Sequence, residues 1–159
     1  MKRMIAFALL LGLCLGGARA YAQEMPVVTG QCAVSADKRR DPASNLVDGK
    51  ITTLFRWYAS TCVTVRPDVP VHGLYLRWEE APGPWEVRVE REGEWTRLCG
   101  GGGDGFCHEY LPLDGLDEPF QLASASPEAL PALAEITLLG AGERPDWIQV
   151  WESAPEKAE

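Results

Sequence analysis

Asn45-Leu-Val-Asp-Gly-Lys-Ile-Thr-Thr-Leu-Phe-Arg-Trp57 is typical of a structured loop and not of a strand. Its Asp48-Gly49 pair is a strong turn signal, because glycine takes a positive φ without penalty and aspartate hydrogen-bonds the backbone that follows it. The Asp48 carboxylate, the Thr53 hydroxyl and the carbonyls between them can converge on one point. Such oxygens suit a hard cation such as calcium. The stretch therefore predicts a metal site, a hydrogen-bonded turn or a ligand site.

Most of the chain beyond this loop has the pattern of short β-strands. Residues 85–90 alternate between apolar side chains, which suit a core, and charged side chains, which suit water. Residues 91–94 then predict a tight turn into a second strand at 95–99. Further short runs bounded by Pro, Gly or Asp lie at 62–66, 74–78, 107–111, 120–123 and 132–139. About eight strands with turns between them predict an all-β fold, an antiparallel jelly-roll β-sandwich.

Residues 1–22 have the pattern of a secretory signal peptide. A basic start precedes an apolar run at 4–15, and small residues follow it at the expected cleavage site. A transmembrane anchor is the alternative, but the apolar run is shorter than the roughly 20 residues that a membrane span needs. We expect a secreted, periplasmic or cell-surface protein that has no membrane contact after signal cleavage.

The composition is acidic, with 15 Lys and Arg against 23 Asp and Glu and a formal net charge of −8. Loss of the three positive charges of the signal peptide brings the charge to about −11. Nucleic acids and anionic membrane surfaces require clustered basic residues, so the charge argues against both as partners. Neutral sugars or cationic groups fit better, although the solubility of an exported protein explains the acidity by itself.

Four cysteines remain after signal cleavage: Cys32, Cys62, Cys99 and Cys107. An even number in an exported domain predicts two disulfides. Cys99 and Cys107 flank a glycine-rich loop at 100–106, and covalent closure of such a loop removes much unfolded-state entropy. We therefore favour Cys99 with Cys107 and, by remainder, Cys32 with Cys62. A zinc site beside His108 is the alternative, but the close Cys-x-x-Cys spacing is missing.

Four segments together resemble the discoidin, or coagulation-factor type C, domain: residues 43–57, 74–78, 85–95, and 134–136 with Gly140. This resemblance implies a galactose-binding-like β-sandwich. We expect the domain to span residues 28–152 and a linker or tail to follow at 153–159.

A second resemblance concerns the end of the chain. Residues 140–159 are similar to the junction after which some bacterial proteins begin a PIG-L-type deacetylase domain, a zinc-dependent enzyme that deacetylates N-acetylglucosamine-like sugars. The chain contains no His-Pro-Asp-Asp motif of those enzymes and no Gly-x-Ser-x-Gly elbow. We therefore expect a non-catalytic accessory module. Its expected partners are a glycan or cell-wall polysaccharide and, in related proteins, a deacetylase domain. The alternative is a structural domain that packs on a neighbouring catalytic domain through Trp147 and Trp151.

The discoidin resemblance also implies a structural calcium ion under the Asp-Gly loop. Asp48 and Thr53 would contribute side-chain oxygens, Lys50 its backbone carbonyl and Glu135 a closing carboxylate. Lys50 departs from the family, which often has an acidic or amide residue there. The alternative is that Asp48 caps its own turn and Glu135 is a solvated strand residue, and both remain open.

Sugar-binding modules of this fold use loops at one end of the sandwich, where an aromatic ring packs on a pyranose. Arg56, Trp57 and Tyr58 lie just past the Asp-Gly loop, and we favour Arg56 and Tyr58 because the family commonly buries the aromatic that follows the loop. The second group lies beyond the glycine loop and comprises Phe106, His108 and Tyr110. Three tryptophans in alternating strands are expected in the core: Trp78, Trp85 and Trp95.

Overall fold

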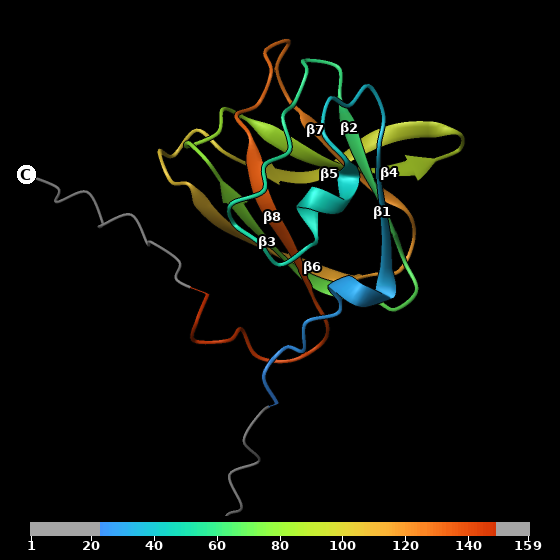
Figure 1. Ribbon diagram of the computed structural model, residues 1–159. Helices are drawn as coiled ribbons and strands as arrows, with labels where there is room; N and C mark the ends of the chain where they lie inside the picture. Colours follow the sequence, from blue (N-terminus) through green and yellow to red (C-terminus); the bar gives the residue numbers. More distant parts are fainter. Residues whose placement is uncertain (1–22, 149–159) are drawn as a thin grey trace, which may run out of the picture.

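Eight strands form two antiparallel sheets that pack face to face in a computed structural model, which describes residues 23–148 (Figure 1). The five-stranded sheet has the order β1-β2-β7-β4-β5 and the three-stranded sheet the order β6-β3-β8. The strands are β1 (Cys32–Ala36), β2 (Cys62–Pro67), β3 (Val71–Trp78), β4 (Trp85–Arg91), β5 (Glu94–Gly101), β6 (His108–Leu116), β7 (Phe120–Ser124) and β8 (Leu133–Leu139). The predicted all-β sandwich is confirmed.

Helical structure in residues 23–148 is confined to two short 3-10 turns, η1 (Thr29–Gln31) and η2 (Ala43–Leu46). In this part of the chain no helix has the length and hydropathy needed to cross a membrane. The predicted signal peptide and tail lie outside the described residues.

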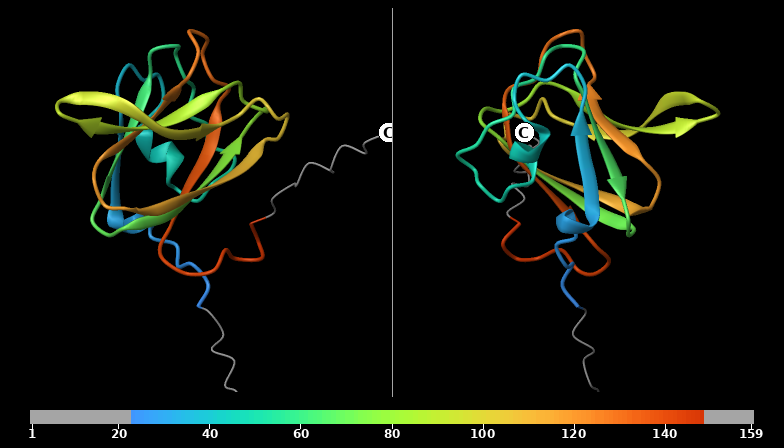
Figure 2. Two further views of the ribbon diagram at one scale, coloured as in Figure 1. Left: turned by 180° about the vertical axis from the view of Figure 1, so that it is seen from behind. Right: turned by 45° about the vertical axis from the view of Figure 1, so that its right-hand side comes forward.

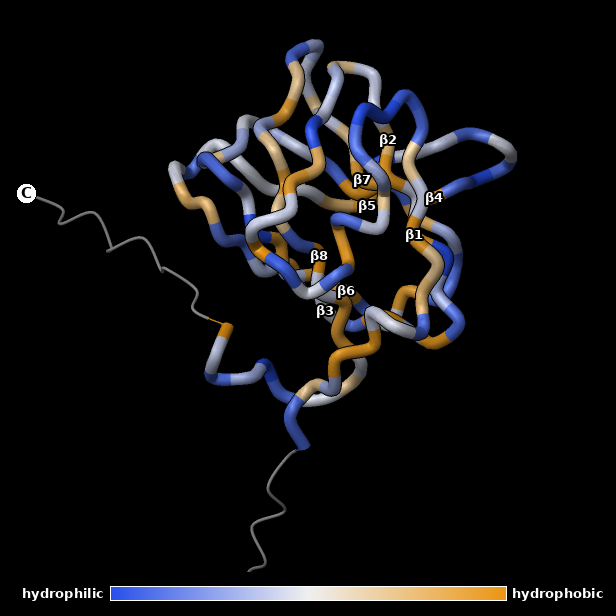
Figure 3. Tube along the Cα trace, viewed as in Figure 1, coloured by the Kyte–Doolittle hydropathy of each residue, from blue (hydrophilic) through white to orange (hydrophobic). Residues whose placement is uncertain are grey.

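The strand order places the long connections together. Because neighbouring strands run antiparallel, the segments that follow β1, β3, β5 and β7 leave the sandwich at one end, and the chain enters and leaves at the other (Figure 1). We call these segments the apical loops; they are residues 37–61, 79–84, 102–107 and 125–132. Figure 3 shows hydrophobic stretches along the facing strands and hydrophilic residues concentrated in the loops.

The predicted hairpin is present, but one of its residues is not where we expected it. Arg91 pairs with Glu94, and the two residues between them have positive φ, 54° at Glu92 and 85° at Gly93. The hairpin projects beyond the sandwich (Figure 2), so no second sheet covers its tip. Trp95 is therefore 37% exposed, and its predicted place in the core is wrong. Trp78 and Trp85 are buried as predicted.

The predicted disulfides are not formed, since all four cysteines of residues 23–148 are free thiols. Cys32 lies opposite Pro67 in the β1–β2 pair, five positions along β2 from Cys62. At about 3.3 Å per residue this separation far exceeds the roughly 7 Å that a disulfide spans between Cα atoms. Cys99 packs against the core from β5, whereas Cys107 is exposed before β6. The two thiols therefore have different surroundings despite their closeness in sequence.

A carboxylate inside the sandwich connects the two sheets. Glu109 on β6 accepts hydrogen bonds at Oε2 from the indole N–H groups of Trp78 and Trp85, both at 2.7 Å. Its Oε1 accepts a third from the Gly102 amide at 2.6 Å. Burial raises the pKa of Glu109, and the three donors partly offset that rise. Since Trp78 is on β3 and Trp85 on β4, this one side chain fixes a strand of each sheet and the start of an apical loop.

Replacement of Glu109 by alanine should destabilise the fold strongly. It leaves two buried indole N–H groups and one amide without an acceptor, and each unsatisfied group costs about 1–3 kcal/mol. We expect the free energy of unfolding in urea to fall by about 3 kcal/mol or more. Glu90→Ala, at an exposed position of β4, is the control and should change it little. Equal losses in the two variants would contradict the role of Glu109.

Candidate functional site

The Asp48 loop gathers oxygen atoms as the sequence predicted. The Lys50 amide donates to Asp48 Oδ1 at 2.8 Å, which makes Asp48 the cap of its own turn. Thr53 Oγ1 lies 2.9 Å from both carboxylate oxygens of Asp48 and 2.8 Å from the Lys50 carbonyl oxygen. A hydroxyl carries one hydrogen and can donate to only one of these three acceptors. Three acceptor oxygens therefore surround a hydroxyl that has only one hydrogen to donate.

Glu135 on β8 closes this group from the sheet. Its residue is 8% exposed, and Oε2 is buried without a hydrogen-bond partner among the described residues. Burial raises the pKa of Glu135 to about 7, with the nearby Asp48 carboxylate adding to the rise and the Gly49 amide and Arg77 opposing it. The interpretation of Glu135 as a solvated residue is therefore wrong. Asp48, Lys50 and Thr53 are in contact with one another, and Glu135 lies near Asp48 and the Gly49 amide.

This donor set fits a hard cation. It offers two carboxylates, a backbone carbonyl and a hydroxyl, and calcium takes six to eight oxygens of these kinds. Residues 23–148 contain no group of three or more His, Cys, Asp and Glu side chains placed to hold a metal. A cation in this loop would therefore depend on the Lys50 carbonyl and the Thr53 hydroxyl as well as on Asp48 and Glu135.

The first predicted ligand residues lie on an apical loop, each in a different environment. Arg56 is held by Asp41, through its amide at 2.9 Å and its guanidinium at 3.1 Å. Trp57 is buried against Phe55 and Trp78, with ring centroids 5.7 and 6.1 Å away. Tyr58 is 50% exposed. None of the three lines the cavities described below.

The second predicted group does meet in space. A cavity of about 160 Å³ between β5 and β6 has Phe106, His108 and Tyr110 among its lining residues. Tyr110 also lies under Arg144, whose guanidinium carbon is 5.8 Å from the ring centroid. The structure therefore groups these three residues but separates them from Arg56 and Tyr58.

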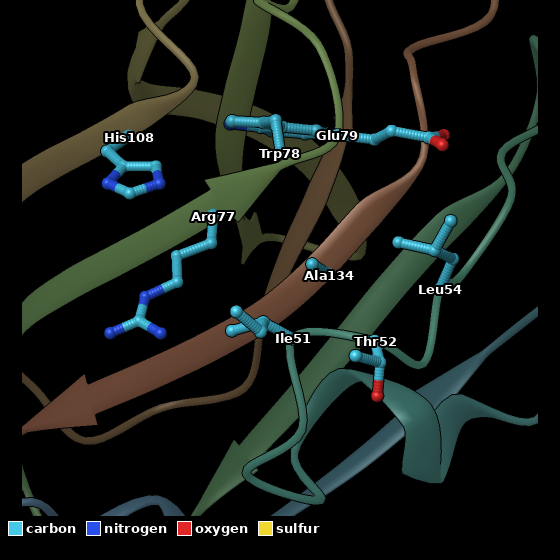
Figure 4. A pocket seen from close by; sticks show the side chains of 8 residues that line it. All are labelled: Ile51, Thr52, Leu54, Arg77, Trp78, Glu79, His108 and Ala134. Atoms are coloured by element: carbon cyan, nitrogen blue, oxygen red, sulfur yellow. The ribbon is translucent and has the colours of Figure 1, made fainter.

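The largest of the three cavities lies on the outer face of the three-stranded sheet, near the apical loops. We call it the upper cavity; its volume is about 420 Å³. Its lining residues come from β3 and the apical loop that follows it, from β6 and β8, and from the Asp48 loop (Figure 4): Ile51, Thr52, Leu54, Arg77, Trp78, Glu79, His108 and Ala134. Figure 4 shows Arg77 and His108 side by side, with the Glu79 carboxylate turned away from both. The guanidinium and the imidazole thus face the same space, next to apolar side chains of the loop.

Arg77 is held in place but has unused donors. Its guanidinium carbon lies 5.5 Å from the centroid of the Tyr75 ring, and the Tyr75 hydroxyl is 3.2 Å from His108 Nδ1. No carboxylate of the described residues lies within 4.0 Å of Arg77. Its Nε is buried and has no hydrogen-bond partner among those residues. A fixed, unpaired guanidinium beside a cavity suits the recognition of a polar ligand.

Our sequence reasoning missed Arg77. A signal was present, because Arg77 lies between Leu76 and Trp78 in a strand whose alternation sends it to the face opposite the core. What the sequence did not show is that β3 is the central strand of a three-stranded sheet, with His108 and Glu135 opposite Arg77 on its two neighbours.

Comparisons with known proteins support the fold. No protein-family model matches the chain, and no curated protein matches it. The family 32 CBM from C. perfringens NanJ in complex with galactose has 18% identity and a TM-score of 0.56, covering 74% of this chain and 99% of its own. A chitosan-binding module from a Paenibacillus chitosanase/glucanase has 16% identity and a TM-score of 0.56, covering 74% and 100%. The F5/8 type C domain of a Bacteroides fragilis protein has 20% identity and a TM-score of 0.52, covering 76% and 97%.

The chain therefore has the fold of family 32 carbohydrate-binding modules and F5/8 type C, or discoidin-like, domains. This agrees with the resemblance found in the sequence. The identities are low, so the comparisons define the architecture, and the ligand has to be argued from this chain's own residues.

Proposed function

We propose that this protein is an exported, non-catalytic carbohydrate-binding module with its ligand site in the upper cavity. The observation that carries the proposal is the unpaired Arg77 guanidinium beside His108, in a cavity whose other wall is apolar. A volume of about 420 Å³ is in the usual range for small-ligand sites. Apolar contacts from Ile51 and Leu54 suit the face of a sugar ring, and the guanidinium donors suit its oxygen atoms.

The finer proposal is an accessory role beside a sugar deacetylase. Its support is the likeness of residues 140–159 to the junction that precedes PIG-L-type domains. A coding sequence that continues past Glu159 into a His-Pro-Asp-Asp motif would support this role, and a different catalytic domain would contradict it.

A structural packing domain is the second candidate, because Trp147 is 46% exposed. However, Trp147 packs edge-on against Tyr75 on β3 of the same domain, with ring centroids 5.8 Å apart. Part of its surface is therefore used within the domain. Trp151 lies outside the described residues.

We also propose that Asp48, Thr53, Glu135 and the Lys50 carbonyl hold a structural calcium ion. The support is the orphaned, buried Glu135 Oε2 facing a loop that already gathers three oxygens around Thr53. The same loop contributes Ile51, Thr52 and Leu54 to the upper cavity. A cation here would therefore fix one wall of the ligand site while taking no part in contact with the ligand.

Glu135→Gln should stabilise the protein in chelator but remove most of its response to calcium. In chelator the folded state is less stable as pH rises from about 4.5 to 7, because Glu135 keeps its proton in the fold after the unfolded chain has lost it. Glu135→Gln removes that loss and should raise the melting temperature at pH 8 in chelator. With calcium at a hundred times its dissociation constant, the wild type should gain about 2.7 kcal/mol and the variant much less.

The control for this experiment is Glu128→Gln, an exposed residue of another apical loop. It should keep the full calcium response. A wild-type melting temperature that is the same in calcium and in chelator would contradict the calcium proposal.

Loss of Arg77 should weaken glycan binding more than loss of the residues favoured from sequence. Hydrogen bonds to charged groups contribute about 1.5–3 kcal/mol, so Arg77→Ala should lower affinity by about tenfold or more. His108→Ala should lower it less, and Arg56→Ala with Tyr58→Ala should leave it unchanged. Affinity electrophoresis on a panel of polysaccharides, followed by calorimetry with the best binder, measures this. A larger effect at Arg56 and Tyr58 would place the site on the apical loop instead.

A further inference from the structure

We propose that the ligand is an acidic oligosaccharide, with a carboxylate bound by Arg77 and a neighbouring sugar on Trp147. This inference rests on the proposed carbohydrate-binding function and specifies the class of glycan. Its basis is a second cavity that meets the upper cavity at Arg77.

The second cavity lies further along the outer face of the three-stranded sheet and has a volume of about 330 Å³. Its lining residues come from β3, β8, the Asp48 loop and the segments before β1 and after β8: Val27, Thr29, Val47, Gly49, Arg77, Glu135, Thr137 and Trp147. Arg77 also lines the upper cavity, so the two spaces are neighbours across one side chain. Together they offer room for at least two sugar rings with Arg77 between them.

The state of Arg77 favours a carboxylate over hydroxyl groups alone. A guanidinium stays charged at every pH that a protein tolerates, and its two terminal nitrogens form a fork that matches the two oxygens of a carboxylate. In this structure the Nε is buried, which leaves the two terminal nitrogens to meet a ligand, and no acidic side chain of residues 23–148 forms an ion pair with Arg77. Sugar hydroxyls would satisfy the hydrogen bonds but leave the charge uncompensated.

The acidic residues near Arg77 leave room for an anion. Glu135 is its register neighbour on β8, but this carboxyl lies close to Asp48 and the Gly49 amide. With calcium in the proposed site, the charges of Asp48 and Glu135 would be compensated. The Glu79 carboxylate points away from Arg77 (Figure 4). His108, on the other side of Arg77, adds an imidazole whose nitrogens donate or accept according to its tautomer.

Trp147 provides a surface for the neighbouring sugar. Its ring is 46% exposed, lines the second cavity and stands at 78° to the Tyr75 ring. That edge contact fixes the indole while leaving ring surface open, as sugar stacking requires. An oligosaccharide bound by Arg77 and Trp147 must therefore extend across the sheet and cannot end in a single deep pocket.

Matched pairs of oligosaccharides test this inference. Hexamers of galacturonate, glucuronate and mannuronate are compared by calorimetry with the same hexamers after reduction of their carboxyls to hydroxymethyl groups, all in calcium. We expect the acidic form of the best binder to bind at least tenfold more tightly than its reduced form. Arg77→Gln should abolish that preference, while Arg56→Gln, a matched arginine variant, should keep it. Trp147→Ala should weaken binding of the acidic hexamer but not of its monomer.

The possible outcomes separate the inference from the proposed function. If a reduced hexamer binds as tightly as its acidic form, or if Arg77→Gln and Arg56→Gln have equal effects, the acidic ligand is wrong but glycan binding stands. If no acidic or neutral glycan binds at all, the proposed function itself is wrong. Melting temperatures of the variants in calcium show whether each is folded.

Discussion

The proposed ligand site on the outer face of the three-stranded sheet depends on one interaction that does not form, an ion pair between Glu135 and Arg77. Glu135 lies opposite Arg77 in register, and a pair of opposite charges on neighbouring strands would ordinarily attract. The carboxyl lies near Asp48 and the Gly49 amide, and no ion pair with Arg77 forms within 4.0 Å. Glu135 thus lies beside the loop where we propose a cation, and the Arg77 guanidinium stays free of an ion pair.

The remaining structure makes this arrangement rigid. Glu109 holds a tryptophan from each sheet and so fixes the end of β3 from which Arg77 projects. Tyr75 supports the Arg77 guanidinium from below and contacts both His108 and Trp147. A site built on a central strand, with each side chain supported by a neighbour, keeps its geometry better than one built on loops. The sheet thus holds the polar side chains of the proposed site in place, and the Asp48 loop adds apolar side chains to its wall.

The sequence predicted the architecture better than it predicted the site. Strong alternation and turn residues located seven of the eight strands, but β1 was missed because its core-facing positions include the small residues Cys32 and Ala36. The contacts among Asp48, Lys50 and Thr53 could be predicted because they follow from local turn chemistry. The Cys32–Cys62 pairing and the burial of Trp95 were wrong because both depend on strand register and on how far a hairpin projects. Arg77 was missed for a related reason, since its neighbours are brought to it only by the strand order.

The most direct test of this account is the map of amide chemical-shift changes when an acidic hexasaccharide is added to the calcium-loaded protein. We predict that the largest changes follow the outer face of the sheet, at Arg77, His108 and Thr137, together with the indole N–H of Trp147. Changes confined to the apical loops, at residues 37–42 and 56–61, would contradict a site on the sheet.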